Sequence, residues 1–184
     1  MSCCRGHASR YWCERHPDVY KDKYKNYYCV FHAPSEHKDI PPELFNDLFF
    51  QEIAHAVENE EPCNLSLAII PGDIDFAIFN DESPLPQIDF KEAVFEGAVD
   101  FSNVTFGGKI DLTRTEFLKE VSFLNADFKD EALFFDSIFN MKVNFKDVKF
   151  EKIVCISWGS FKAGADMGGT QYGGKLLLKR PSHN

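Results

Sequence analysis

Large hydrophobic side chains recur through the second half of the chain at alternating steps of five and six residues. Seventeen consecutive positions of this register hold such a residue. An α-helix is excluded, because steps of five and six residues turn by about 500° and 600° around a helix at about 100° per residue and would scatter the side chains. The positions are Phe90, Phe95, Phe101, Phe106, Leu112, Phe117, Phe123, Phe128, Phe134, Phe139, Phe145, Phe150, Ile156, Phe161, Met167, Tyr172 and Leu178.

The residue two places before each of these hydrophobes is never charged and is usually small or β-branched, as in Val99, Val121 and Val143. The residue between the two is usually polar, as in Asp100 and Asp111. Alternate residues of a strand face the same side, so each triplet predicts a very short strand with two inward side chains and one outward side chain. Such strands bury their inward pair only by stacking on copies of themselves, which predicts a β-solenoid.

The same spacing continues upstream with one interruption. Leu65, Ile70 and Phe76 keep the step, and the register then slips by three residues before Phe90. The polar, proline-rich composition of residues 80–87 predicts an inserted surface loop at the slip. We therefore place the solenoid at residues 62–178 and a tail at 179–184. Whether the glycine-rich C-terminal part continues the solenoid is left open, because it loses its phenylalanines.

The units AVFEG, AVDFS, NADFK and VNFKD resemble pentapeptide repeats, in which a small residue and an Asp or Asn precede a central Leu or Phe. The resemblance implies a mainly β fold, a right-handed quadrilateral β-helix with the central hydrophobe and the small residue pointing inward. This chain departs from the pattern by inserting a sixth residue in alternate units. We therefore expect 22 residues for each circuit of the coil instead of 20.

Residues 41–61 precede the solenoid and contain an amphipathic pattern over 41–58. Pro41 and Pro42 suit the first turn of a helix, and Glu43 suits its electrostatics. We expect the apolar face of this helix to cap the N-terminal end of the solenoid, and we expect His55 to be structural or exposed. The apolar face consists of Leu44, Phe45, Leu48, Phe49, Ile53, Ala56 and Val57.

The first 40 residues differ in kind, because they concentrate cysteine and histidine. A structural zinc site uses four Cys or His ligands, often with one pair separated by a tight turn, and Cys29 and His32 form such a pair. Some pentapeptide-repeat proteins carry a similar N-terminal segment that ends in the same Cys-x-x-His spacing. The alternative is that these cysteines are buried apolar residues and the histidines are solvated. The expected ligands are Cys4, Cys13, Cys29 and His32, with Cys3, His7 and His16 as alternates.

Charge is distributed unevenly along the chain. The net charge is -9, yet residues 1–32 hold six Lys or Arg against three Asp or Glu, which leaves -12 for the remainder. An acidic body is a poor ligand for nucleic acid, because phosphate contacts need cationic side chains. No apolar run reaches the length of a membrane helix, and the N-terminus lacks the apolar stretch of a secretory signal, so we expect a cytoplasmic protein without membrane contact.

The sequence holds no recognisable catalytic motif. The glycine pairs at 107–108, 168–169 and 173–174 lack the Gly-Lys-Ser/Thr context of a phosphate loop and fit corners between repeat units. A phenylalanine-filled coil is also expected to leave no cleft. We therefore expect a non-catalytic protein–protein interaction or scaffold module, with a homo-oligomer through a solenoid end as one form of contact. The resemblance adds the alternative of a DNA mimic that binds type II topoisomerases. A third hypothesis is nucleic-acid binding by the basic, aromatic N-terminal segment.

Overall fold

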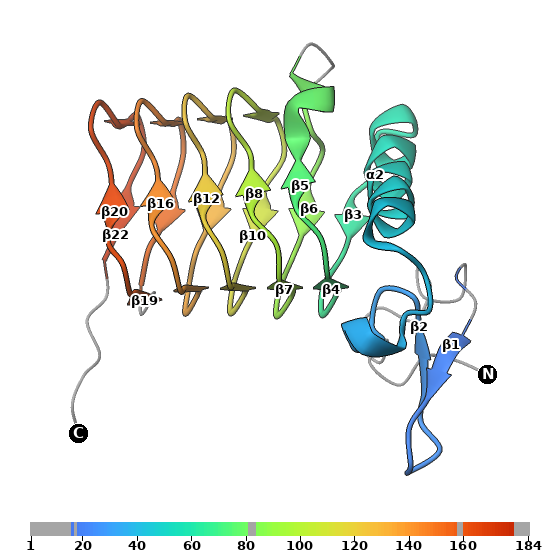
Figure 1. Cartoon of the computed structure of the whole chain (residues 1–184). Coiled ribbons are helices and arrows are strands. Elements are labelled where there is room, and N and C mark those ends of the chain that lie inside the picture. The colour runs from blue at the N-terminus through green and yellow to red at the C-terminus, as the bar shows by residue number, and fades with distance from the viewer. Residues whose placement is uncertain (1–15, 17, 81–83, 158–159, 179–184) are drawn as a thin grey trace.

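A computed structural model describes residue 16 and residues 18–80, 84–157 and 160–178. Four parallel sheets of two-residue strands form the four sides of one coil (Figure 1). The first is β3 (Cys63–Asn64), β6 (Ile88–Asp89), β10 (Ile110–Asp111), β14 (Ala132–Leu133), β18 (Val154–Cys155) and β22 (Leu176–Leu177). The second is β4 (Ile69–Ile70), β7 (Val94–Phe95), β11 (Glu116–Phe117), β15 (Ile138–Phe139) and β19 (Ser160–Phe161).

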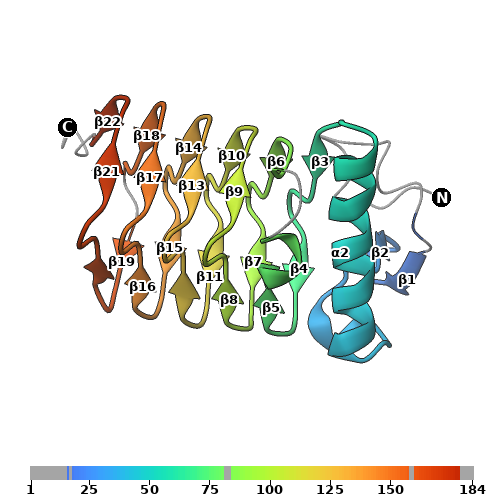
Figure 2. The ribbon, with the colours of Figure 1, turned by 90° about the horizontal axis from the view of Figure 1, so that it is seen from above.

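The remaining two sides complete the circuit. The third sheet is β5 (Ile74–Asp75), β8 (Val99–Asp100), β12 (Val121–Ser122), β16 (Val143–Asn144) and β20 (Ala165–Asp166), and the fourth is β9 (Thr105–Phe106), β13 (Asp127–Phe128), β17 (Lys149–Phe150) and β21 (Gln171–Tyr172). In Figure 1 the chain advances from right to left, rises along the near side through β5 and β8, and descends along the far side through β6 and β10, which Figure 2 shows from above. This winding is right-handed, and it confirms the predicted mainly β, four-sided solenoid.

The strand pairing repeats every 22 residues, as the five- and six-residue steps require. Ile110 pairs with Ile88 and Ala132, one circuit before and after it. The first circuit is longer, since Cys63 pairs with Ile88. The extra residues fall where the register slips in the sequence. There the 3-10 helix η3 (Phe76–Phe79) precedes Leu85, which is buried and bridges to Phe106. The predicted surface loop therefore also supplies one core residue.

Phenylalanine rings fill the interior as stacked files that run along the coil axis. Phe101, Phe123 and Phe145 form one such file, with ring centroids 4.9 Å apart at each step. Phe95, Phe117 and Phe139 form a second, also with 4.9 Å steps. These spacings match the separation of neighbouring strands, because each of these three circuits contributes one ring to each file. The predicted inward position of the central hydrophobe is confirmed in these coils.

Burial declines towards the C-terminal end, although the strands continue to β22. Phe161 is only half-buried, and Met167, Tyr172 and Leu178 are exposed. The prediction that these last positions are inward core residues is therefore wrong for the three exposed side chains. The reason is positional, because no further coil among the described residues covers the last ring. The ladder of hydrogen bonds nevertheless continues, as Val154 to Leu176 pairing shows.

The helix α2 (Pro42–Glu58) covers the opposite end of the coil (Figures 1 and 2). Phe49 is fully buried and contacts Phe76 and Phe90 of the first coils, with ring centroids 6.0 Å and 6.2 Å away. Leu44 was predicted on this apolar face but is 47% exposed. The first turn of α2 meets the coil through its neighbours, since Phe45 is fully buried and Asn46 Nδ2 donates to the Asp73 carbonyl at 2.8 Å, and Leu44 faces solvent. His55 lies on the outer side and pairs with Glu61 at 3.1 Å.

A small N-terminal segment packs beside the helix. It contains an antiparallel hairpin of β1 (Asp18–Lys21) and β2 (Tyr27–Cys29) and the 3-10 helix η2 (Ser35–His37). Its largest side chain in the core is Phe31, which is fully buried and meets the ring of Phe45 from α2 at 5.3 Å. Within the described parts of the chain, no helix is long and apolar enough to cross a bilayer.

Candidate functional site

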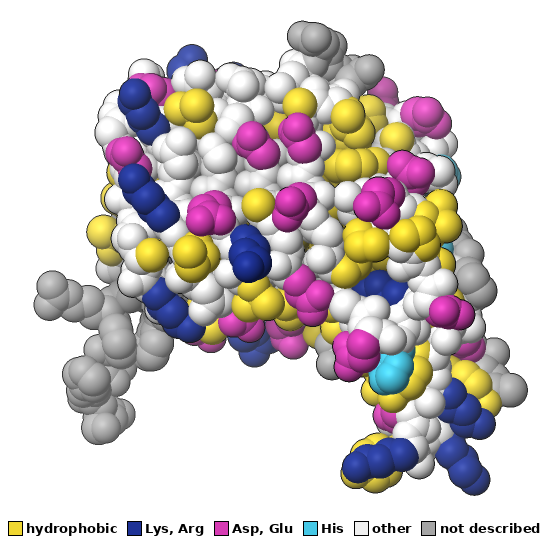
Figure 3. All heavy atoms as spheres, in the orientation of Figure 1, with side chains coloured by type: hydrophobic (Ala, Val, Ile, Leu, Met, Phe, Trp, Pro, Cys, Tyr) yellow, Lys and Arg dark blue, Asp and Glu magenta, His cyan; other side chains and the backbone are white. Residues whose placement is uncertain are grey.

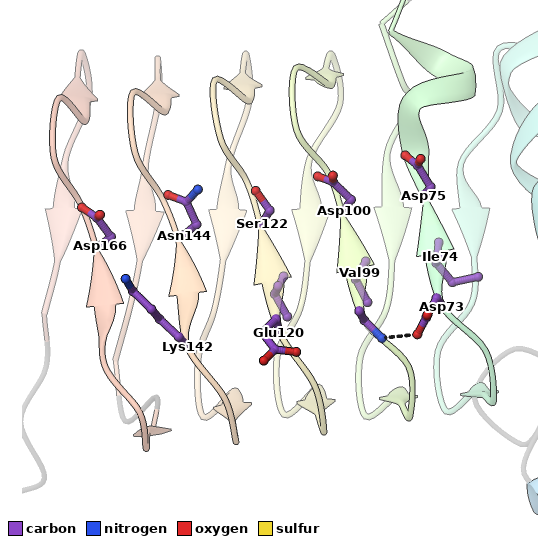
Figure 4. Close-up of a pocket in the computed structure, with 12 residues that line it drawn as sticks. Asp73, Ile74, Asp75, Val99, Asp100, Glu120, Ser122, Lys142, Asn144 and Asp166 are labelled. Carbon is purple, nitrogen blue, oxygen red and sulfur yellow. Dashed lines mark hydrogen bonds between the residues drawn. The ribbon is translucent and has the colours of Figure 1, made fainter.

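An open groove runs along the side of the solenoid built from β5, β8, β12, β16 and β20. It encloses about 500 Å³ and crosses all five strands of that sheet (Figure 4). The expectation that the coil leaves no cleft is therefore wrong for its outer surface, although the interior is filled. We call this feature the acidic groove. Its floor includes Ile74, Val99 and Val121, whose side chains turn inward.

Two rows of outward side chains border the floor, and both follow from the repeat. The upper row consists of the residue after the inward β-branched or alanine position in each strand, and the lower row of the residue before it (Figure 4). Parallel pairing places equivalent residues of successive coils side by side, for example Asp75 beside Asp100. The upper row is Asp75, Asp100, Ser122, Asn144 and Asp166, and the lower row is Asp73, Ala98, Glu120 and Lys142.

Backbone hydrogen bonds hold most of the groove carboxylates in fixed positions. Asp100 Oδ1 accepts from the Ser102 amide at 2.8 Å, and Asp166 Oδ1 accepts from the Gly168 amide at 3.1 Å. Asp73 Oδ1 accepts from the Ala98 amide of the next coil at 2.8 Å, which is the dashed line in Figure 4. Each of these contacts uses one carboxylate oxygen, so the other oxygen remains available to a ligand.

None of the five groove carboxylates takes part in an ion pair with another described residue. Lys142 is the one cation among the residues that line the groove, and it lies towards the C-terminal coils. Figure 3 shows this side of the molecule, where acidic and apolar side chains are interspersed. The Lys and Arg side chains of the solenoid lie mainly towards the C-terminal coils, and others gather on the N-terminal hairpin. The groove is therefore strongly acidic at the end nearer α2.

Several carboxylates on other sides of the coil are paired with lysines that bridge two neighbouring circuits. Lys129 bridges Asp127 at 2.8 Å and Glu151 at 2.7 Å, and these hydrogen bonds raise the pKa of Lys129 to about 12. Similarly, Lys91 bridges Asp89 at 3.2 Å and Asp111 at 3.1 Å. The contrast shows that the excess negative charge of the solenoid is not spread evenly over its surface.

Asp111 is a specific departure from the sequence reasoning. It was predicted to face solvent, but only 4% of its surface is exposed. Lys91, from the preceding circuit, and Lys109, two residues before Asp111 in the chain, lie over its carboxylate at 3.1 Å and 3.4 Å. Burial alone would raise the pKa of this carboxyl, but hydrogen bonds from Thr113 and Lys91 hold the pKa below its usual value. The side chain does point outward, and the covering lysines bury it.

The second candidate site is the predicted zinc segment, of which the structure describes one half. Cys29 and His32 lie together at the end of β2, with Cys29 Sγ 3.2 Å from His32 Nδ1, and both residues are buried. The His32 Nε2 atom lies 3.0 Å from the carbonyl oxygen of Ser66. Because a carbonyl only accepts, Nε2 carries the proton and Nδ1 presents its lone pair to Cys29.

This arrangement fits a metal-binding pair. Ligating histidines commonly donate their second ring N–H to a carbonyl, as His32 does, and that contact fixes the tautomer and ring orientation. Lys38 is buried beside the pair and donates to the carbonyl of Phe31 at 3.2 Å and to the carbonyl of Val30. Burial lowers the pKa of Lys38 to about 7, against the opposing attraction of Cys29 and Glu96.

The other predicted ligands are not assembled among the residues that can be placed. Cys4 and Cys13, and the alternates Cys3 and His7, lie outside the described residues. The alternate His16 is described, but its Nε2 lies 3.2 Å from Glu52 Oε1 and its ring packs on Phe31 at 4.7 Å. Over residue 16 and residues 18–178, apart from the gaps at 17, 81–83 and 158–159, no group of three potential metal ligands occurs.

Comparison with known proteins bears on the solenoid alone. Residues 90–138 match the family described as "Pentapeptide repeats (9 copies)". These residues run from the first phenylalanine of the regular register to β15, and the match supports the resemblance seen in the sequence units. No curated protein and no solved structure matches the chain.

Proposed function

We propose that the protein is a non-catalytic interaction module that presents one side of a rigid solenoid to a partner protein. The observation that carries this proposal is the acidic groove, in which five carboxylates border one continuous surface and form no ion pair with another described residue. The fold does not require this arrangement, because several carboxylates on the other sides of the same coil, among them Asp89, Asp111 and Asp127, are paired with lysines.

The geometry of the groove is suited to binding and not to proton transfer. Its carboxylates border an open surface, and no described histidine or cysteine lines the groove beside them. The stacked rings below hold the strands rigidly, so a partner meets a preorganised surface and loses little entropy in ordering it.

A pull-down with the full-length protein, at physiological salt and from its own host, tests this proposal. We expect at least one other protein to be retained in a fixed ratio to the bait and to be released by added salt, because surface charge contacts are screened. Recovery of the bait alone, under conditions in which it remains folded by circular dichroism, would contradict the proposal.

We also propose that the N-terminal segment binds one structural zinc ion through Cys4, Cys13, Cys29 and His32, with Cys3, His7 and His16 as alternates. The support is the Cys29–His32 pair and the fixed tautomer of His32. A segment this small has little core of its own, so a metal would stabilise its packing on α2.

Metal analysis of the purified protein tests this. About one zinc per chain is expected in the wild type, and much less in a Cys29→Ala/His32→Ala variant. A chelator should lower the melting temperature of the wild type only. Absence of metal from protein that was purified without chelator would refute the zinc site.

The DNA-mimic alternative has weaker support. A duplex mimic needs continuous negative charge, but Ser122 and Asn144 interrupt the upper row and Lys142 interrupts the lower row. The carboxylates of Asp89, Asp111 and Asp127 on other sides are paired with lysines. No observation favours this function over the interaction module, and we do not propose it.

A further inference from the structure

We propose that the acidic groove binds an extended, basic peptide segment of a partner protein, about six residues long and rich in Lys or Arg. This inference rests on the proposed interaction function and specifies its ligand. It follows from three properties of the groove: its length, its uncompensated charge and its partly apolar floor.

The length of the groove requires an elongated ligand. The groove spans the five strands from β5 to β20, which are four steps of the roughly 4.8 Å strand spacing, or about 19 Å in all. An extended chain at about 3.3 Å per residue covers this distance in about six residues. The groove is open along its side, so a segment of a larger partner can lie in it without its ends having to enter a closed cavity.

The charge of the groove selects the residues of that segment. Asp73 and Asp75 lie at the α2 end, Asp100 and Glu120 follow on the next two coils, and Asp166 lies on the last. A ligand that lies along the groove therefore meets at least one carboxylate on four of the five coils. Because no described cation pairs with them, a basic ligand gains these contacts without displacing an internal salt bridge. The same charge repels the phosphates of nucleic acid.

The partly apolar floor of the groove favours a peptide ligand over small cations. Ala98 is half-buried between two acidic coils, and the edges of Ile74 and Val99 lie beneath it. The methylene stems of Lys and Arg can pack on such a surface while their charged ends reach the carboxylates at its borders. Lys142 opposes binding towards the C-terminal coils, so the contacts of the segment are concentrated between β5 and β12.

Fluorescence anisotropy with a labelled hexa-lysine peptide and the full-length protein tests the assignment. The variant Asp100→Asn/Glu120→Gln removes two groove charges and keeps the side-chain sizes. Asn144 occupies the equivalent upper-row position two coils later and makes the same backbone hydrogen bond, at 3.0 Å to Lys146, so Asn at position 100 is compatible with the fold.

The matched control is Asp136→Asn/Asp147→Asn, which gives the same net charge at two exposed corners outside the groove. Both corner residues have positive φ, of 58° and 57°, which Asn tolerates well. Far-UV circular dichroism and melting temperature verify that each variant is folded before binding is measured.

Each exposed ion pair changes affinity by about 1.4- to five-fold, so the groove variant, which removes two charges, should bind the peptide about two- to twenty-five-fold more weakly than the wild type. The control should stay within two-fold, and Lys142→Gln should bind more tightly. Equal weakening in the groove variant and the control would overturn the proposal, because it would indicate attraction by net charge alone. Equally tight binding of spermine would also overturn it, since that would indicate a site for free polyamines.

The pull-down separates failure of this inference from failure of the interaction function. Should Asp100→Asn/Glu120→Gln retain the same host protein as the wild type does, in the same ratio and with the same salt dependence, the groove assignment falls and the interaction module stands. Should neither form retain a partner, the interaction function falls as well.

Discussion

The stacked phenylalanine files make the cost of a core truncation depend on its position along the coil. Phe123 is fully buried in the middle of its file, stacked at 4.9 Å on both Phe101 and Phe145, and it meets Phe134 edge-on at 5.7 Å. Truncating a buried Phe to Ala costs about 3–5 kcal/mol, and loss of two stacked partners places the cost at the upper end of that range. We expect Phe123→Ala to lower the free energy of unfolding by about 4–5 kcal/mol.

Tyr172 supplies the matched control, because it occupies the equivalent inward position near the exposed end. It is 40% exposed, and among the described residues it stacks on one ring, that of Phe150, at 5.7 Å. We therefore expect Tyr172→Ala to cost only about 1–2 kcal/mol. Urea unfolding followed by far-UV circular dichroism measures both. Equal losses in the two variants would refute the reasoning, because they would show that the interior files do not carry the stability of the coil.

Three further predictions follow from close contacts and buried polar groups. Gly97→Ala should lower the free energy of unfolding by more than about 2 kcal/mol in a urea titration, because an added Cβ would overlap the backbone of the preceding coil. The control Lys119→Ala, at the equivalent position one circuit later, should change the free energy of unfolding little. Ser137→Ala should cost about 1–3 kcal/mol in the same assay, since its Oγ donates at 2.7 Å to the buried carbonyl of Leu112, and no loss would contradict this. The pKa of Lys38 is about 7 in the folded protein and near 10.5 when unfolded, so the unfolded chain holds more protons between these values and stability rises with pH. From pH 7.5 to pH 9.5 the wild type should therefore gain about 1–3 kcal/mol in free energy of unfolding relative to Lys38→Met. A difference between the two proteins that stays constant with pH would contradict the burial of the Lys38 amine.

The repeat allowed the inward and outward positions of the coil to be predicted from the sequence. A position such as Phe123 is specified twice, by its place in the five- and six-residue register and by the small residue Val121 before it. Both indicate an inward side chain, and only a stacked coil satisfies them together. The same reasoning fails at the ends, where Tyr172 follows the register but has no coil beyond it among the described residues, and where Leu44 follows the helical pattern but faces solvent.

The acidic groove was only partly accessible to sequence reasoning. The upper row from Asp100 to Asp166 can be listed from the 22-residue period, and its two acidic and two neutral residues are visible there. The lower row was missed, because residues such as Glu120 precede the strand triplet and read as corner residues. Which carboxylates are neutralised also depends on long lysine side chains that cross between coils, as Lys91 does at Asp111. Sequence spacing does not determine those side-chain directions.

The most direct test of the interaction proposal is to map where a basic peptide touches the folded protein. We propose a nitrogen-15 NMR titration of the full-length protein with the hexa-lysine peptide, following every assigned backbone amide. The account predicts that shift changes concentrate in residues 73–75, 98–100 and 120–122, with smaller changes at 142–144, and that the β10 and β14 side stays unchanged. Changes spread evenly over all four sides, or centred on a side whose carboxylates are already paired with lysines, would contradict it.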